Sequence, residues 1–280
     1  MLYSIDKHIL SGPDVQTSLC TGKDSGAFAS GQPDTLVLHF TAGGSLASAV
    51  KTLVSPDVKA SAHVAVGRGG EIVQMVPFDR IAWHAGVSSW NGRTNLNRYS
   101  IGIEIDNAGR LSPSGDGFVS WFGRRYERAE ALEAVHRNEK TASFWHVYTE
   151  EQIEACFQLC ATLVEAYGIK NIVGHEEIAP GRKTDPGPAF PLDRLREQLL
   201  VGRKEDVRNP LIPVAPQAVA VGVVASSLLN VRKQPHKSSE LSGEPVARGT
   251  RVEILETSGE WCRVKIERQG WVAKDFLRIS

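Results

Sequence analysis

The chain has 280 residues, enough for one large domain or two ordinary ones, and its 32 basic residues balance its 32 acidic residues. This balance argues against a nucleic-acid partner, because phosphate binding normally requires a basic excess. No run of about 18 apolar residues occurs, so we expect no membrane span. The N-terminal segment carries charges where a signal peptide needs an apolar core, so we expect the chain to be cytoplasmic at synthesis.

Apolar and alternating runs predict strands over residues 35–40, 62–66, 71–75 and 100–106. Helical periodicity predicts helices over Leu46–Leu53, 149–167 and Pro191–Leu199. Arg68 and the two glycines after it separate two alternating runs, which is typical of a hairpin. An α/β fold follows, with a mixed β-sheet flanked by helices.

The stretch from Pro113 to Tyr148 interrupts this pattern. It is rich in charge around Arg124 and carries aromatic residues at Trp121 and Trp145. Such a run predicts a solvated helix that a few aromatic side chains anchor. The alternative is a segment that forms one wall of a cleft.

Two histidines and one aspartate are the candidate metal ligands. His39 ends the apolar strand Leu36–Leu38, and His175 ends a similar run that begins at Asn171. Proline and glycine in the following loop can turn Asp185 back toward His175. Two imidazoles and one carboxylate are the ligand set of a catalytic zinc, which keeps a fourth position for water. Taken singly, each could instead be an ordinary hydrogen-bonded side chain.

The composition changes after Leu200. Residues 204–222 are rich in Pro, Ala and Val and lack periodicity, as in a semi-extended linker. Short alternating strands separated by turns follow, which predicts a small all-β barrel. The expected domains are therefore residues 1–203, a linker over 204–222 and a barrel over 223–280.

Five segments with distinctive residues occur in order: Leu38–Ala42, Ser61–Gln74, Ala82–Gly86, Ser100–Ile105 and Gly174–Gly187. Together they resemble the zinc-dependent N-acetylmuramoyl-L-alanine amidases, a family that also contains phage amidases and peptidoglycan-recognition proteins. The resemblance covers about residues 30–200. It is nearest to the bacterial amidases that trim muropeptides.

The resemblance implies a role for each residue of the candidate site. His39, His175 and Asp185 would bind one zinc ion, Glu104 would be the general base, and Lys183 would stabilise the developing oxyanion. Chemistry agrees with these roles, since zinc acidifies water and a carboxylate can move the proton to the leaving amine. A lysine beside the metal can stabilise negative charge in the transition state. Alone, Glu104 and Lys183 would be interpreted as surface charges.

Four residues are predicted to bind substrate. His84 could bind a peptide carbonyl or steady the site as a neutral imidazole. In the next loop Trp90, Asn91 and Arg93 offer an apolar face, an amide and a guanidinium, which suit a sugar ring and a peptide carboxylate. The alternative is an ordinary polar loop. His63 is expected to be structural.

The segment after the linker resembles a bacterial SH3 domain, on Leu229–Arg232 at its start and Gly270–Val272 near its end. This resemblance implies a module that holds cell-wall peptide. The alternative is a structural cap on the first domain. Trp261 and Trp271 could serve as core residues or as a ligand platform.

The predicted activity is zinc-dependent hydrolysis of the amide between N-acetylmuramic acid and L-alanine, in peptidoglycan or muropeptides. A non-catalytic peptidoglycan-binding protein and a zinc peptidase that cuts within the stem peptide are the alternatives. A recycling enzyme, a phage lysin released by lysis and an effector exported by a dedicated secretion machine all fit the sequence.

Overall fold

The computed structural model describes residues 2–201, 220–225, 228–237, 239–258, 261–265, 269–273 and 277–279. The chain divides into two compact units, Met1–Asn209 and Pro210–Ser280. Among the described residues, no helix combines the length and the apolar character needed to cross a membrane.

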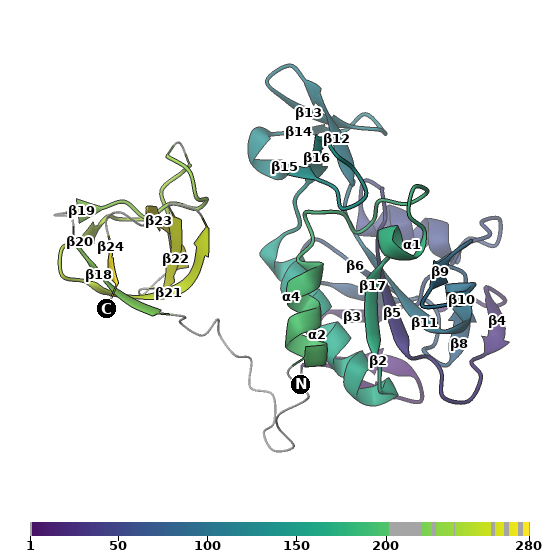
Figure 1. The fold of residues 1–280 in the computed structure, drawn as a ribbon. Helices are drawn as coiled ribbons and strands as arrows, with labels where there is room; N and C mark the ends of the chain where they lie inside the picture. The colour runs from purple at the N-terminus through teal and green to yellow at the C-terminus, as the bar shows by residue number, and fades with distance from the viewer. Residues whose placement is uncertain are drawn as a thin grey trace. The chain divides into compact units, whose positions relative to one another are not determined.

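A six-stranded mixed sheet forms the centre of the first unit (Figure 1). In spatial order its strands are β17 (Asn171–Gly174), β5 (Thr35–Phe40), β11 (Ser100–Ile105), β6 (Val64–Val66), β7 (Ile72–Gln74) and β3 (Val15–Thr17). The first four run parallel, β7 is antiparallel to β6, and β3 is parallel to β7. The predicted α/β fold with a mixed sheet is confirmed, and so is the hairpin between β6 and β7.

The helices agree with the sequence pattern. They are α1 (Leu46–Val54), α2 (Glu150–Tyr167), α3 (His175–Ile178) and α4 (Leu192–Arg196), which a turn of π-helix over Glu197–Val201 extends. The Thr149 side chain accepts a hydrogen bond from the Gln152 N–H and caps the start of α2. Gly168 ends the helix with φ +65°, a conformation that glycine adopts without strain.

Alternation along the central strands separates a core face from a site face. Leu36 and Leu38 on β5, like Ile103 on β11, belong to the main core, in which α2 contributes Cys156 and Leu159 among others. Because successive strand residues point to opposite faces, His39 and Glu104 project from the other face. They are neighbours there, since β5 and β11 pair in parallel with His39 opposite Glu104. The sheet itself therefore brings two site residues together.

The inserted stretch is a second sheet, and the prediction of a solvated helix is wrong. Its antiparallel strands are β14 (Arg125–Tyr126), β13 (Gly117–Ser120), β12 (Arg110–Ser114), β16 (Ala142–His146) and β15 (Ala131–Val135), in that spatial order (Figure 1). We call them the inserted sheet. Gly115 and Gly123 turn the chain at φ +64° and +87°. Phe118 and Phe144 then meet across the sheet, with ring centroids 4.6 Å apart. Strand pairing over long sequence distances, with aromatic side chains packed together, thus replaces the helix that the local charge pattern predicts.

Short pairs of strands complete the first unit: β1 (Ser4–Asp6) with β2 (Ile9–Ser11), β4 (Asp24–Ala27) with β8 (Arg80–Ala82), and β9 (Ser89–Trp90) with β10 (Arg93–Thr94). Two 3-10 turns cover Leu96–Arg98 and Arg128–Glu130. Strand β8 leads into the Ala82–Gly86 segment and β9 and β10 follow it, so small paired strands flank this part of the main chain.

The second unit is a small all-β domain that curls around its own core (Figure 1). Five antiparallel strands lie in the order β23 (Gln269–Ala273), β22 (Trp261–Lys265), β21 (Arg251–Ser258), β18 (Ala220–Val224) and β24 (Leu277–Ile279), and β19 (Leu228–Leu229) pairs with β20 (Val246–Ala247). Val231, Ile254 and Val264 are in its core. Most of the predicted linker and the Trp271 side chain lie outside the described residues, so the domain limits stay predictions.

Candidate metal centre and catalytic site

Three side chains converge where the parallel strands β5 and β17 end. His39 is the fifth residue of β5, His175 follows β17 directly as the first residue of α3, and Asp185 lies in the loop after that helix. The His39 and His175 Nδ1 atoms are 2.9 Å apart, and Asp185 Oδ2 lies 3.0 Å from the first and 2.9 Å from the second. All three side chains are buried. The structure thus brings together all three predicted ligands.

Main-chain carbonyls fix which ring nitrogen of each histidine carries the hydrogen. The Nε2 atom of His175 lies 3.0 Å from the Ala85 carbonyl oxygen, which only accepts, so this nitrogen donates. His84 Nε2 lies 3.2 Å from the Ser100 carbonyl oxygen and donates in the same way. His84 Nδ1 then accepts from His39 Nε2 at 3.0 Å. We therefore assign an unprotonated Nδ1 to both His39 and His175.

This donor set fits a metal cation. The Nδ1 lone pairs of His39 and His175 and the carboxylate of Asp185 face each other in a buried space. Burying these acceptors without a donor costs free energy, and a cation bound between them removes this cost. Burial, followed by the nearby His175, lowers the pKa of His39 to about 4. The imidazole is therefore neutral at pH 7, the form that binds metals.

Glu104 and Lys183 lie next to this cluster. Among the described residues, the buried Oε2 atom of Glu104 has no hydrogen-bond partner. Burial and then the Asp185 carboxylate raise the pKa of Glu104 to about 8, against the opposing charge of Lys183. A carboxyl group with a pKa near neutrality can take up and release a proton at physiological pH. Lys183 is half-buried, two residues before Asp185.

His84 and His63 are both structural neighbours of the cluster. The His84 ring lies against Gly102, where a Cβ atom would overlap it, so only glycine leaves room for the ring on the sheet. His63 Nε2 donates to the Arg80 carbonyl oxygen at 2.8 Å, and its Nδ1 accepts from the Gly102 N–H at 3.0 Å. His84 therefore contacts a predicted ligand, whereas His63 holds the main chain.

The other predicted substrate residues lie on the β9–β10 hairpin. Trp90 packs against a buried cluster that includes Val37. Asn91 is exposed in the turn with φ +47°. The Arg93 guanidinium lies 2.9 Å from both carboxylate oxygens of Asp34, so its charge is already paired within the protein. Their roles in substrate binding stay predictions.

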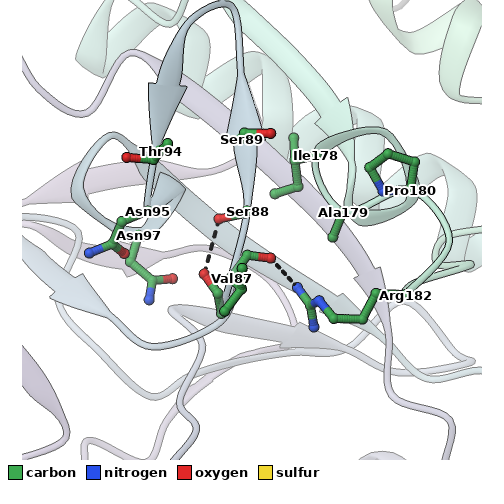
Figure 2. A pocket seen from close by; sticks show the side chains of 11 residues that line it. Val87, Ser88, Ser89, Thr94, Asn95, Asn97, Ile178, Ala179, Pro180 and Arg182 are labelled. Atoms are coloured by element: carbon green, nitrogen blue, oxygen red, sulfur yellow. Dashed lines mark hydrogen bonds between the residues drawn. The ribbon is translucent and has the colours of Figure 1, made fainter.

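A cavity of about 930 Å³ lies between the segment that begins at Gly86 and the loop after α3. Figure 2 shows Val87, Ser88 and Ser89 on one side and Ala179, Pro180 and Arg182 on the other. The Arg182 guanidinium donates to the carbonyl oxygens of Ala85 and Val87, at 3.0 and 2.6 Å. Because the Ala85 carbonyl also orients His175, the cavity wall and the metal centre share this stretch of main chain.

Two residues of this region were not predicted from the sequence. Arg182 ties the loop after α3 to the Ala85–Val87 segment, and Glu176 is buried beside the ligand His175 with its carboxylate fully engaged. A signal existed for both, since each charge adjoins a predicted site residue in the sequence. Their partners are distant in the sequence, however, and only the fold reveals them.

The decisive comparison is with protein families. The profile described as N-acetylmuramoyl-L-alanine amidase matches residues 29–188, which include all three convergent side chains together with Glu104 and Lys183. The chain belongs to the N-acetylmuramoyl-L-alanine amidase family. The second unit matches the bacterial SH3 domain over residues 226–278. Both family resemblances expected from the sequence are confirmed.

Two proteins with similar sequences are named as amidases. The chain is 37% identical over 141 residues to the 1,6-anhydro-N-acetylmuramyl-L-alanine amidase AmpD of Escherichia coli. The aligned region covers 50% of this chain and 58% of AmpD. The chain is 33% identical over 205 residues to the N-acetylmuramoyl-L-alanine amidase AmiD of the same organism, covering 70% and 63%. The chain thus spans less than two thirds of either relative. A solved complex of AmiD with the substrate anhydro-N-acetylmuramic acid-L-Ala-D-gamma-Glu-L-Lys aligns with a TM-score of 0.47 at 28% identity, over 77% of this chain and 76% of that one.

Proposed function

We propose that the chain hydrolyses the amide bond between N-acetylmuramic acid and L-alanine in peptidoglycan or muropeptides, with one zinc ion per chain. The observation that carries this proposal is the convergence of His39 Nδ1, His175 Nδ1 and Asp185 Oδ2 within 3.0 Å, on the face of the sheet that bears Glu104. The family match and the names of AmpD and AmiD support the choice of bond.

The composition of the site supports zinc as the metal. Two imidazole nitrogens and one carboxylate oxygen are the ligand set of catalytic zinc sites, so His39, His175 and Asp185 would hold the ion. When bound, zinc supplies Lewis acidity, which acidifies water and polarises a carbonyl group. The chain contributes the tautomer of both histidines that leaves Nδ1 as the acceptor, through the carbonyls of Ala85 and Ser100, and one negative charge from Asp185.

Two further side chains would act on the reacting atoms. Glu104 would accept a proton from the attacking water and return it to the leaving amine. Lys183 would place positive charge near the carbonyl oxygen as that atom becomes negative. His84 would act through His39, by holding the ring in the tautomer that binds metal.

The cavity beside Ala85 and Arg182 is the place where we expect the stem peptide to bind. Its wall continues from the Ala85 carbonyl that orients His175, and the exposed Ser89 and Thr94 supply polar groups for a peptide main chain. Figure 2 shows these groups on a hairpin opposite the α3 loop, so a peptide between them would contact both walls.

The experiment that tests the activity is mass spectrometry of products from purified peptidoglycan, digested by the zinc-loaded full chain. Stem peptides that begin with L-alanine are the expected products. The matched control is a Glu104→Gln chain, which keeps the shape of the side chain but cannot accept the proton. It should release stem peptides at least about 100-fold more slowly. Fragments cut within the stem would identify a peptidase instead. Wall binding without any release would identify a recognition protein.

For the second unit we propose binding to the polymeric cell wall. Its separate core and its match to the bacterial SH3 domain support an independent module. Strand β18 begins at Ala220, so a clean deletion removes residues 210–280. This deletion should weaken sedimentation with intact peptidoglycan while small muropeptides are hydrolysed at an unchanged rate. An equal loss on both substrates would mean that the module is a structural cap.

A further inference from the structure

The turn that carries Asp185 is held at both ends by one residue, Glu176. The Glu176 N–H donates to the Asp185 carbonyl oxygen at 2.8 Å, and the Gly187 N–H donates to Glu176 Oε2 at 3.1 Å. Between these two bonds, the Tyr148 hydroxyl donates to the Pro186 carbonyl oxygen at 2.8 Å. The position of the carboxylate ligand therefore depends on where Glu176 is fixed.

Glu176 is in turn fixed by the inserted sheet. Its side chain is buried, and its carboxylate is held by two residues of the connection between β15 and β16. His136 Nε2 lies 2.6 Å from Oε2, and Arg137 Nε lies 2.8 Å from Oε1. The neighbouring Asn138 amide donates to the Glu176 carbonyl oxygen at 2.8 Å. Three consecutive residues thus hold one residue of α3.

Packing reinforces these polar contacts. Trp145 on β16 is fully buried, and a Cβ atom added at Gly187 would lie 3.1 Å from its indole ring. The His136 ring stacks on the same indole, with centroids 5.4 Å apart and planes inclined by 25°. The indole therefore contacts both the Asp185 turn and one partner of Glu176. A shift of the β15–β16 connection would move the turn.

The inserted sheet also reaches the segment that follows His39. Trp121 Nε1 donates to the Ala42 carbonyl oxygen at 2.8 Å, and the Arg124 guanidinium donates to the Gly44 carbonyl oxygen at 2.9 Å. Ala42 has φ +49°, which is strained for a residue with a side chain and persists only where surrounding contacts hold it. The sheet therefore contacts both segments that carry histidine ligands.

We propose that the inserted sheet is a brace for the metal site and that Glu176 is the positioning residue through which it fixes the Asp185 turn. The inference rests on the metal-binding part of the proposed function and adds a determinant of metal affinity outside the ligand set. Groups that orient metal ligands typically change metal affinity by about 10- to 100-fold when they are removed. The brace is expected to act within this range.

The test measures zinc affinity of the full chain by competition with a chromophoric chelator, without substrate. Glu176→Gln keeps the shape of the side chain but removes the charge that pairs with Arg137, and His136→Ala removes a donor to the same carboxylate. Both should bind zinc about 10- to 100-fold more weakly. His136→Gln retains a side-chain N–H donor and should restore most of the affinity. Far-ultraviolet circular dichroism of the metal-free chains should be unchanged, which would show that the backbone fold is retained.

Glu133→Gln is the matched control, because Glu133 is an exposed carboxylate on β15, the strand that leads into the same connection. It should bind zinc as the unmodified chain does. Unchanged affinity in Glu176→Gln and His136→Ala, or an equal loss in Glu133→Gln, would overturn the brace. If the unmodified chain binds no zinc, the proposed function fails at its metal. If it binds zinc and releases stem peptides while Glu176→Gln does so equally well, only the brace fails.

Discussion

Asp185→Ala should lose zinc and amide hydrolysis together. The substitution removes the carboxylate of the cluster and leaves two imidazoles, and the Nδ1 atom of one of them, His175, lies 2.9 Å from the lost carboxylate oxygen. Loss of a direct ligand should exceed the range typical of supporting groups, so we expect zinc affinity to fall more than about 100-fold. Zinc per chain, measured by elemental analysis after dialysis, and stem-peptide release should fall in parallel.

The matched control for this substitution is Asp57→Ala. Asp57 is an exposed carboxylate in the loop after α1, so its removal changes the net charge equally without touching the cluster. It should retain both zinc and hydrolysis. Full zinc occupancy with normal turnover in Asp185→Ala would remove Asp185 from the ligand set.

Lys183→Ala should keep the metal and lose turnover. Lys183 belongs to the loop of the cluster but is not one of its three convergent donors, so zinc content should stay at one ion per chain. Removing a group that stabilises an oxyanion typically costs about 100-fold or more in kcat, because its effect is exerted mainly in the transition state. Steady-state kinetics on a defined muropeptide should show the loss in kcat, with a much smaller change in KM.

Lys170→Ala, which removes an exposed lysine ahead of β17, is the comparison for general charge effects. It should hydrolyse at the normal rate. Metal loss in Lys183→Ala would assign the lysine to the construction of the site, and an unchanged kcat would assign the oxyanion to another group.

The sequence predicts the part of this protein that depends on local pattern. The run Leu36–Leu38 is apolar throughout because both faces of a parallel strand are buried, and the histidine at its end is therefore aimed by a rigid element. The same reasoning locates His175 after β17. The α2 helix follows from its periodicity and its Thr149 cap.

Long-range pairing explains what sequence reasoning could not find. Arg93 looks available for a substrate carboxylate, yet Asp34, 59 residues earlier, occupies its guanidinium. The inserted sheet depends on β12 meeting β16, a strand that begins 32 positions after β12 does, and its charges are distributed along strands instead of a helix. Neither partner can be recognised before the fold is known.

The carbonyl oxygens that orient the ligand histidines belong to the backbone, and this affects how the site tolerates sequence drift. Every amino acid carries the carbonyl that Ala85 and Ser100 present, so replacements at these positions keep the acceptor if the main chain stays in place. The link through His84 is not protected in this way, because a side chain connects His39 to the Ser100 carbonyl oxygen. Over evolutionary time, His175 can therefore keep its orientation through many neighbouring substitutions, whereas the orientation of His39 depends on the survival of one additional imidazole.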